Sequence, residues 1–183
     1  MGGEGGCDAL MKRRDPKAYR ISELDLSIRE SRTRKEAKIM ARARMHNVNV
    51  PDLFGVSNVS IYMEKLNGKL LNSVSITAEY AKRSGELLAS LHNAGMVHGD
   101  FTPANIIAGK DGRLYLIDFG LSEASQGIEE RALDLLLMKR QLNRKMCAIF
   151  IKAYAANAKS SNEAIRRLEK IEERGRYQTR TLA

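Results

Sequence analysis

The stretch that decides the fold is His98-Gly99-Asp100-Phe101-Thr102-Pro103-Ala104-Asn105, followed by Asp118-Phe119-Gly120. Phosphoryl transfer needs metal ions on the phosphate oxygens, a positive group beside them and a group that orients the nucleophile. Asp118 can ligate Mg²⁺ through a hard carboxylate oxygen, and Asn105 can hold the metal from the other side through its amide oxygen. Asp100 can accept a proton from a hydroxyl group or from water. We therefore predict a site that binds ATP and Mg²⁺.

The spacing of these residues supports the same prediction. Asn105 and Asp118 are separated by about one β-hairpin, whose turn is Gly109-Lys110-Asp111-Gly112. A hairpin of this length lets the two ligands face each other. An Asp, four intervening residues and an Asn, followed by Asp-Phe-Gly after an apolar strand, is typical of the protein-kinase catalytic loop and metal-binding segment. His98 is expected only to pack and hydrogen-bond within this loop.

Two upstream residues fit the same chemistry. Lys12 ends the short apolar run at residues 9–12, where a phosphate-binding lysine on a strand would lie. Glu36 lies in the middle of a predicted helix at residues 24–45 and can pair with this lysine. The alternative is that both belong to a solvated basic surface. Combined with the downstream motif, the pattern favours an ion pair.

The remaining periodicity predicts an α+β chain. The expected elements are a strand at 9–12, a helix at 24–45, strands within 53–63, a helix at 77–93, strands at 106–107 and 114–117, and helices at 128–156 and 162–173. Turns are expected at Ser57-Asn58 and Asn67-Gly68, and a polar tail at 174–183. We predict a two-lobed, minimal protein-kinase-like fold with an N-lobe at 1–66 and a mainly helical C-lobe at 67–183.

Composition limits the class of protein. No stretch reaches the roughly 18 apolar residues of a membrane span, and residues 1–6 contain no apolar signal core, so we expect neither a membrane nor secretion. The two cysteines show no metal-ligand spacing, which favours a cytoplasmic location. The net charge is +9, and residues 10–46 hold 12 Lys or Arg against 5 Asp or Glu. This excess indicates either an acidic or RNA partner or a solvated helix face.

A family resemblance extends over nearly the whole chain from Leu10. It is carried by Met11-Lys12-Arg13-Arg14-Asp15-Pro16-Lys17-Ala18-Tyr19-Arg20, Leu24-Asp25, Arg32-Thr33-Arg34-Lys35-Glu36-Ala37, Tyr62-Met63-Glu64, residues 98–105 and 116–122, Asp134-Leu135 and Arg174-Gly175-Arg176. These segments resemble the PRPK family, the small atypical, RIO-like serine/threonine kinases or ATPases of the KEOPS (EKC) complex. The compact chain is similar to its archaeal members.

The resemblance implies an ATP-dependent subunit that supports threonylcarbamoyladenosine modification of tRNA. Its partners would be the catalytic subunit of the transfer complex, docked or fused, other KEOPS subunits, and tRNA bound through the basic surface and tail. The implied nucleotide-binding residues are Lys12, Glu36, Met63 and Glu64, with adenine on the backbone around Glu64. The implied catalytic residue is Asp100, and the implied metal ligands are Asn105 and Asp118.

Two departures from the family pattern affect the prediction. Gly2-Gly3-Glu4-Gly5-Gly6 stands only a few residues before Lys12, so we expect a truncated N-lobe. The loop reads Thr102-Pro103-Ala104 where relatives often carry Thr-Thr-Ser.

Fifteen residues separate Asp118 from Asp134 and no Ala-Pro-Glu follows, so a peptide-docking activation segment does not fit.

Two other functions stay open. One is a small-molecule phosphotransferase of the aminoglycoside or choline kinase type, which shares His-Gly-Asp and the following Asn. The other is a scaffold that binds nucleotide with little turnover. For the tail, Arg174, Arg176 and Arg180 lack acidic neighbours within 174–183, which indicates either RNA contact or a solvated terminus.

Overall fold

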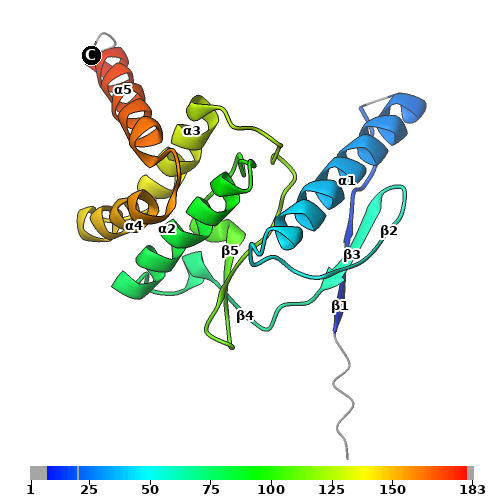
Figure 1. Cartoon of the computed structure of the whole chain (residues 1–183). Helices are drawn as coiled ribbons and strands as arrows, with labels where there is room; N and C mark the ends of the chain where they lie inside the picture. The colour runs from blue at the N-terminus through cyan, green and yellow to red at the C-terminus, as the bar shows by residue number, and fades with distance from the viewer. Residues whose placement is uncertain (1–7, 20, 181–183) are drawn as a thin grey trace, which may run out of the picture.

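The computed structural model describes residues 8–19 and 21–180, with the side chains of 175–180 excepted. These residues form two small antiparallel sheets and five α-helices, in agreement with the predicted α+β class. Helix α1 and one sheet gather on one side, and α2 to α5 gather on the other (Figure 1). The predictions made for Gly2 to Gly6 lie outside the described residues.

The first sheet has the order β1-β3-β2 and is covered by α1. Its strands are β1 (Ala9–Arg13), β2 (Leu53–Val56) and β3 (Ser60–Glu64), and α1 spans Ser22–Met45. Lys12 pairs with Ile61 in the register of β1 and β3. Alternate residues of a strand point to opposite faces, so Leu10 and Lys12 share one face while Met11 and Arg13 share the other. The predicted lysine strand and glutamate helix are confirmed.

The second sheet has the order β4-β5-β6. The predicted hairpin is confirmed as β5 (Ile106–Gly109) and β6 (Leu114–Leu116). Strand β4 (Gly68–Leu70) was not predicted, because the sequence there indicated only a turn and glycine is rare in strands. Gly68 is required at this place, since a Cβ atom on it would lie 2.4 Å from the Ala108 carbonyl oxygen.

The helical half contains α2 (Ala78–Asn93), α3 (Ile128–Lys139), α4 (Arg144–Asn157) and α5 (Ser161–Arg180), together with two 3₁₀ turns at Leu71–Ser73 and Pro103–Asn105. Thr77 caps α2 as predicted, accepting a hydrogen bond from the Tyr80 N–H. No helix in the described part of the chain is long and apolar enough to cross a membrane.

Two helix predictions were wrong. The single helix expected at 128–156 is divided, because the Asn143 side chain accepts a hydrogen bond from the Met146 N–H and starts α4 there. The last helix was expected to end at Glu173, but α5 continues to Arg180. The segment is rich in good helix formers, and one glycine, Gly175, costs only about 1 kcal/mol in a helix. The polar tail is therefore helical as far as Arg180.

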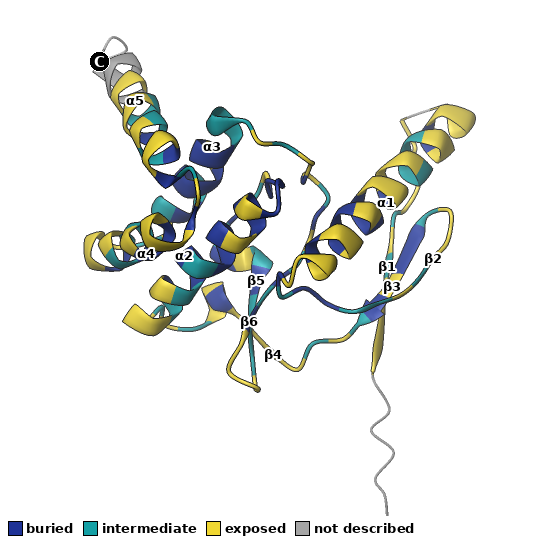
Figure 2. Ribbon diagram, viewed as in Figure 1, coloured by how far each residue is buried: buried dark blue, intermediate teal, exposed yellow. Residues whose placement is uncertain are grey.

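The core joins both halves. Figure 2 shows that α1 buries one side and exposes the other, whereas α2 is buried along much of its length. Among the largest fully buried side chains are Met40 from α1, Ile61 from β3, Leu88 from α2 and Phe119 from the loop after β6. Phe119 belongs to the motif that led to the fold prediction, and its buried ring anchors the segment that carries Asp118.

Candidate active site

Five of the seven predicted site residues line one cavity. The cavity has a volume of about 350 Å³ and lies between the first sheet, α1 and the end of β6. Its lining includes Lys12, Glu36, Met63, Glu64 and Asp118. Most of the remaining lining is apolar, as expected for a pocket that accepts a flat aromatic ring beside a few polar groups. The adenine-binding role predicted for the backbone around Glu64 stays a prediction.

Lys12 joins three segments of the chain. Its ammonium nitrogen lies 2.7 Å from Glu36 Oε1 and 2.7 Å from Asp118 Oδ1. The Glu36 side chain is only 1% exposed, whereas that of Asp118 is 53% exposed. The ion pair predicted between Lys12 and Glu36 is confirmed. Strand β1, helix α1 and the segment after β6 thus place one cation between two carboxylates.

Arg14 is a site residue that the sequence did not reveal. Its guanidinium binds Glu36 Oε2, so the two oxygens of the buried carboxylate have different cations. A Cβ atom built on Gly120 would lie 3.6 Å from the same guanidinium, so Arg14 also borders the Asp-Phe-Gly segment. Its carbonyl oxygen accepts a hydrogen bond from Arg29, 3.3 Å away, which is held in turn by Asp25. Arg14 stands two residues after Lys12, which favours the same face in an extended segment, but nothing in the sequence distinguishes it from the other cations of the basic block.

The catalytic loop is held by its own hydrogen bonds. Asn105 Nδ2 donates to the Asp100 carbonyl oxygen at 2.9 Å and to Asp100 Oδ2 at 2.8 Å. The Asn105 carbonyl oxygen accepts from the Ile117 N–H at 3.0 Å, which fixes the loop beside the residue that precedes Asp118. The structure therefore brings Asp100 and Asn105 together and joins them to the strand end that carries Asp118.

A buried aspartate anchors this loop from below. Asp134, on α3, is fully buried and accepts from the His98 N–H at 2.7 Å and the Gly99 N–H at 2.8 Å. His92 lies 3.2 Å from the same carboxylate and 2.8 Å from the Tyr154 hydroxyl. Burial lowers the pKa of His92, so the neutral ring donates from Nε2 to Asp134 and accepts from Tyr154 at Nδ1. The loop backbone is thereby tied to α2, α3 and α4.

His98 has the structural role that the sequence predicted. It is buried, its Nε2 lies 3.1 Å from the Ile117 carbonyl oxygen, and its Nδ1 accepts from the Asp100 N–H at 3.2 Å. Its ring makes edge contacts with Phe101 and Phe119. Burial lowers the pKa of His98, which keeps the ring neutral and suits these two bonds. His98 thus holds the catalytic loop in position, and we assign it no role in the chemistry.

The surroundings of Asp118 favour its ionised form, which can bind a cation. Burial raises the pKa of Asp118, but the hydrogen bond and charge of Lys12 and the Gly120 N–H outweigh burial, so the pKa lies below its ordinary value. The carboxylate is ionised at neutral pH. Its backbone is left-handed, with φ of 60°, a conformation that Asp tolerates better than most residues and that marks a constrained position.

The residues present fit a magnesium ion bound together with a phosphate. No group of three or more His, Cys, Asp or Glu in the described part of the chain is arranged to hold a metal by itself. Mg²⁺ is commonly bound by one or two protein oxygens together with phosphates and water. Asn105 donates a hydrogen bond from Nδ2 to Asp100, which leaves its amide oxygen as a possible ligand of the metal. Asp118 would supply a carboxylate ligand.

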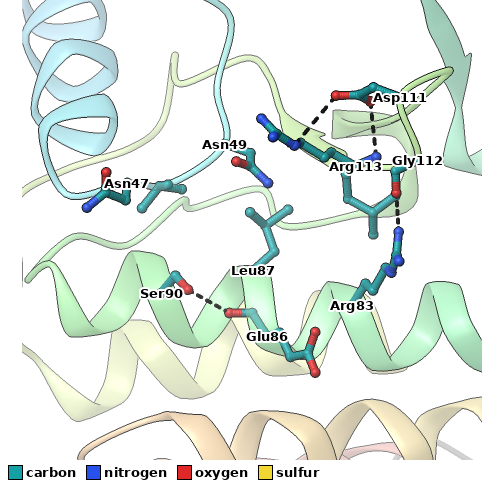
Figure 3. Close-up of a pocket in the computed structure, with 11 residues that line it drawn as sticks. Asn47, Asn49, Arg83, Glu86, Leu87, Ser90, Asp111, Gly112 and Arg113 are labelled. Atoms are coloured by element: carbon teal, nitrogen blue, oxygen red, sulfur yellow. Dashed lines mark hydrogen bonds and ion pairs between the residues drawn. The ribbon is translucent and has the colours of Figure 1, made fainter.

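A second cavity of about 370 Å³ lies apart from these residues, between the end of α1, α2 and the β5–β6 turn (Figure 3). Its charged groups are engaged locally. Arg83 binds Glu79 and the Gly112 carbonyl oxygen, and Asp111 accepts from the Arg113 N–H at 3.0 Å and the Tyr115 hydroxyl at 2.7 Å. None of the predicted site residues lines it.

The arrangement of a strand lysine, a helix glutamate, a catalytic loop and a metal-binding aspartate defines a protein of the kinase-like class. Comparison with known sequences specifies it further. The RIO domain family matches residues 10–165. The chain belongs to the RIO-domain family and, within it, to the Bud32 group.

Three relatives show the extent of the similarity. The chain is 36% identical to a "Probable serine/threonine-protein kinase BUD32 homolog" of Archaeoglobus fulgidus, over 97% of this chain and 94% of the relative. It is 35% identical to "KEOPS complex subunit Bud32" of Pyrococcus abyssi, over 94% and 86%. It is also 35% identical to a "Probable bifunctional tRNA threonylcarbamoyladenosine biosynthesis protein" of Methanosarcina barkeri, over 96% of this chain but 33% of the relative. The chain thus spans about a third of the bifunctional relatives that it matches.

Solved structures show the fold alone. The Rio2 kinase from Chaetomium thermophilum, in a complex with ADP, Mg²⁺ and phosphoaspartate, gives a TM-score of 0.63 at 17% identity, over 90% of this chain and 60% of that one. A macrolide 2′-phosphotransferase from Brachybacterium faecium gives 0.64 at 16% identity, over 92% and 76%. The fold therefore suits both protein and small-molecule phosphotransferases, and family membership, not fold, distinguishes them.

Proposed function

We propose that this chain binds Mg-ATP in the cavity lined by Lys12, Glu36 and Asp118, and that it cleaves the γ-phosphate. The observation that carries the proposal is the position of Lys12 Nζ, 2.7 Å from both Glu36 and Asp118. This arrangement supplies a held cation for phosphate oxygens and an ionised carboxylate for a metal. Met63 and Glu64 would border the adenine at the opposite wall.

Each residue then has a defined task. Bound Mg²⁺ would be held by Asn105 and Asp118 and would neutralise charge on the phosphates. Glu36 holds Lys12 in place, so the lysine can exchange its contact with Asp118 for a phosphate oxygen. Asp100 accepts the proton of the attacking hydroxyl group or water, and its hydrogen bonds from Asn105 fix the orientation of its carboxylate.

The reaction that fits best is ATP hydrolysis, or transfer to the chain itself or to one docked partner. Only fifteen residues separate Asp118 from Asp134, and α3 begins already at Ile128. This leaves little room for the activation segment on which protein kinases bind extended peptides.

The names of its relatives suggest a biological setting. We assign the chain to a KEOPS-type complex that makes threonylcarbamoyladenosine on tRNA, docked on or fused to the subunit that performs the transfer. Cytoplasmic location follows from that role. Contact of tRNA with the basic surface and the C-terminal helix belongs to this proposal, with the bases expected on a polar tail now placed on α5 as far as Arg180.

The decisive variant is Asp118→Ala. Phosphate release from Mg-ATP is measured for the full chain, alone and with the transfer subunit of a bifunctional relative. Without its metal-binding carboxylate, the variant should lose at least about a hundredfold in rate, which corresponds to roughly 2.7 kcal/mol in barrier. Its thermal melt should stay close to that of the parent.

Asp111→Ala is the matched control, because Asp111 is another exposed carboxylate, on the β5–β6 turn and outside the cavity. It should retain the parental rate. If Asp118→Ala retained activity within about threefold of the parent, a difference of roughly 0.7 kcal/mol, the assignment of the site would be wrong. Rapid phosphorylation of generic protein substrates by the chain alone would contradict the proposed reaction.

A further inference from the structure

A groove of about 560 Å³ runs along the exposed side of α1, outside the proposed phosphoryl-transfer cavity. We call it the α1 groove. Its lining includes the cations Arg34, Lys35 and Lys38, one carboxylate, Glu30, and the hydroxyl residues Ser27 and Ser31, and its far wall includes Ala124. Figure 2 shows exposed positions along this helix from its first turns to its last.

The cations of the groove are available to a ligand. Arg34 is 65% exposed, and its Nη2 lies 3.5 Å from Glu30 Oε2. Lys35 is 56% exposed, and its Nζ lies 3.9 Å from Glu123 Oε2. Exposed ion pairs of this kind contribute little to stability, so an anion can replace the carboxylates as the partners of these two cations. Lys38 makes no ion pair or hydrogen bond with any described residue.

The net positive charge of α1 adds to the positive potential of the groove. Helix α1 carries seven bases and four acids. Two of the acids, Asp25 and Glu36, are buried and neutralised by Arg29 and by Lys12 with Arg14. The outer surface of α1 therefore retains six bases against Glu23 and Glu30. Such an excess attracts a polyanion over the range of a Debye length, about 10 Å at moderate salt.

The spacing suits a chain of phosphates rather than a single anion. Ser27, Ser31, Arg34 and Lys38 follow one another at steps of four, three and four residues, so they form one stripe on the helix. The stripe is about 16 Å long at 1.5 Å per residue. The serine hydroxyls have no partner among the described residues, and Ser, Lys and Arg are the side chains that contact phosphates in nucleic-acid complexes.

We propose that the α1 groove binds the phosphate backbone of RNA. The choice of transfer RNA as the particular RNA rests on the proposed function. Arg34, Lys35 and Lys38 contact successive phosphates, with Ser27 and Ser31 extending the path. Binding of this kind is independent of base sequence and falls steeply with salt. It leaves recognition of the nucleotide that is modified to another part of the complex.

The α1 groove is connected through the chain to the nucleotide site. Ala124 lies six residues after Asp118, in a segment that is tied to the catalytic loop because Val97 and Glu123 exchange both of their backbone hydrogen bonds, at 3.0 and 3.1 Å. RNA in the groove touches this segment without entering the cavity. We therefore expect RNA to change ATP turnover through the segment at 121–126.

The test compares two triple variants of the full chain. Arg34→Ala/Lys35→Ala/Lys38→Ala removes the groove cations. The matched control, Arg144→Ala/Lys145→Ala/Lys152→Ala, removes three exposed cations of α4 that have no partner among the described residues. The probe is an unmodified transfer RNA transcript, and binding is measured without nucleotide at several salt concentrations. Thermal melts and basal ATP turnover are measured on the same samples.

The groove variant should bind at least tenfold more weakly at low salt, and the slope of log affinity against log salt should fall by about two to three. The control variant should change that slope by less than one. Equal losses in both variants would mean that only total charge matters, and the groove would not be the site. Retained RNA binding together with lost binding of an acidic polypeptide would show a protein partner instead. Because no nucleotide is present, these outcomes are independent of whether the chain hydrolyses ATP.

Discussion

The Glu36 carboxylate is almost completely buried, and two cations share it. Lys12 binds Oε1 and Arg14 binds Oε2, while Lys12 also reaches Asp118. A buried carboxylate needs such partners, because leaving it with an incomplete set costs several kcal/mol. By taking one oxygen of Glu36, Arg14 reduces the negative charge that Lys12 must neutralise. Lys12 then keeps more of its positive charge for a phosphate.

Arg14→Gln should raise the KM for ATP about tenfold and lower kcat less. Loss of one hydrogen bond to a charged group is worth about 1.5–3 kcal/mol, and 1.4 kcal/mol is a factor of ten. Arg14→Lys should restore part of the affinity, because it restores the charge but not the planar fork. Steady-state kinetics at a temperature where all variants are folded measure this split.

Arg13→Gln is the control for this residue. Arg13 lies next to Arg14 in the chain but is 60% exposed, and its ion pair among the described residues is with Asp15 at 3.7 Å. Its kinetics should match the parent. A fall in the melting temperature of Arg14→Gln with unchanged KM would show that Arg14 stabilises the fold without positioning Lys12.

At the scale of single residues, the sequence predicted the residues that carry the chemistry, but it did not predict that Arg14 binds one of them. Lys12, Glu36 and Asp118 meet as the motif indicated, because their spacing is characteristic of one arrangement in space. Arg14 lies within a basic block of four cations from Lys12 to Lys17, and nothing in the sequence separates the half-buried Arg14 from its exposed neighbours. Only the strand register and the cover of α1 decide that.

Helices α2 and α4 lie close together where Gly85 faces α4. A Cβ atom on Gly85 would lie 2.4 Å from the Phe150 carbonyl oxygen and 2.9 Å from the Tyr154 nitrogen. Both of these are backbone atoms, which cannot turn aside as a side chain can. Glycine at this helical position is therefore a packing requirement and not a helix break.

Gly85→Ala should destabilise the protein by about 1–3 kcal/mol or more. Alanine favours an isolated helix by about 1 kcal/mol over glycine, so helix propensity alone predicts the opposite sign. Urea unfolding, followed by the helical circular dichroism signal, measures the difference. The size of the loss reports how far α4 must move to admit one methyl group.

Ser90→Ala, on the exposed side of the same helix, is the control. Its hydroxyl bonds only to the Glu86 carbonyl oxygen within α2, so the change should stay within about 0.5 kcal/mol. A stabilised Gly85→Ala protein would mean that α2 and α4 pack less closely than the structure indicates.

The elements predicted correctly were those with local signals. Thr77 capped α2, and the turn between Gly109 and Gly112 closed a hairpin. The errors fell where tertiary contacts decide. The break before α4 contains neither Gly nor Pro, and β4 exists only because β5 offers it an edge. The period of the sequence continues through such places, so pattern alone could not divide or add an element there.

At the scale of the whole molecule, one polar network spans the helical half beneath the active site. His92 and Asp134 are fully buried, and Tyr154, whose pKa burial raises to about 12, completes the chain of hydrogen bonds. Arg131 adds a bond to the His92 carbonyl oxygen at 3.0 Å. Asp134 also holds the His98 and Gly99 N–H groups, so the catalytic loop is only as stable as this network.

Stability should therefore fall as the pH drops below about 6.5. Burial lowers the pKa of both His92 and His98 from the ordinary value of 6.5, so below that pH the unfolded chain binds protons that the folded chain does not. Each histidine then contributes stability that is complete above pH 6.5 and is lost on acidification, with a slope of up to about 1.4 kcal/mol per pH unit. Urea unfolding between pH 7.5 and 5.0 measures this slope, in a range above the ordinary titration of Asp and Glu. His92→Gln should reduce the slope by about one proton, whereas His46→Gln, at an exposed residue, should leave it unchanged. Stability that stays constant or rises between pH 6.5 and 5.0 would show that the buried rings are protonated in the folded protein, and that the Asp134 network is built differently.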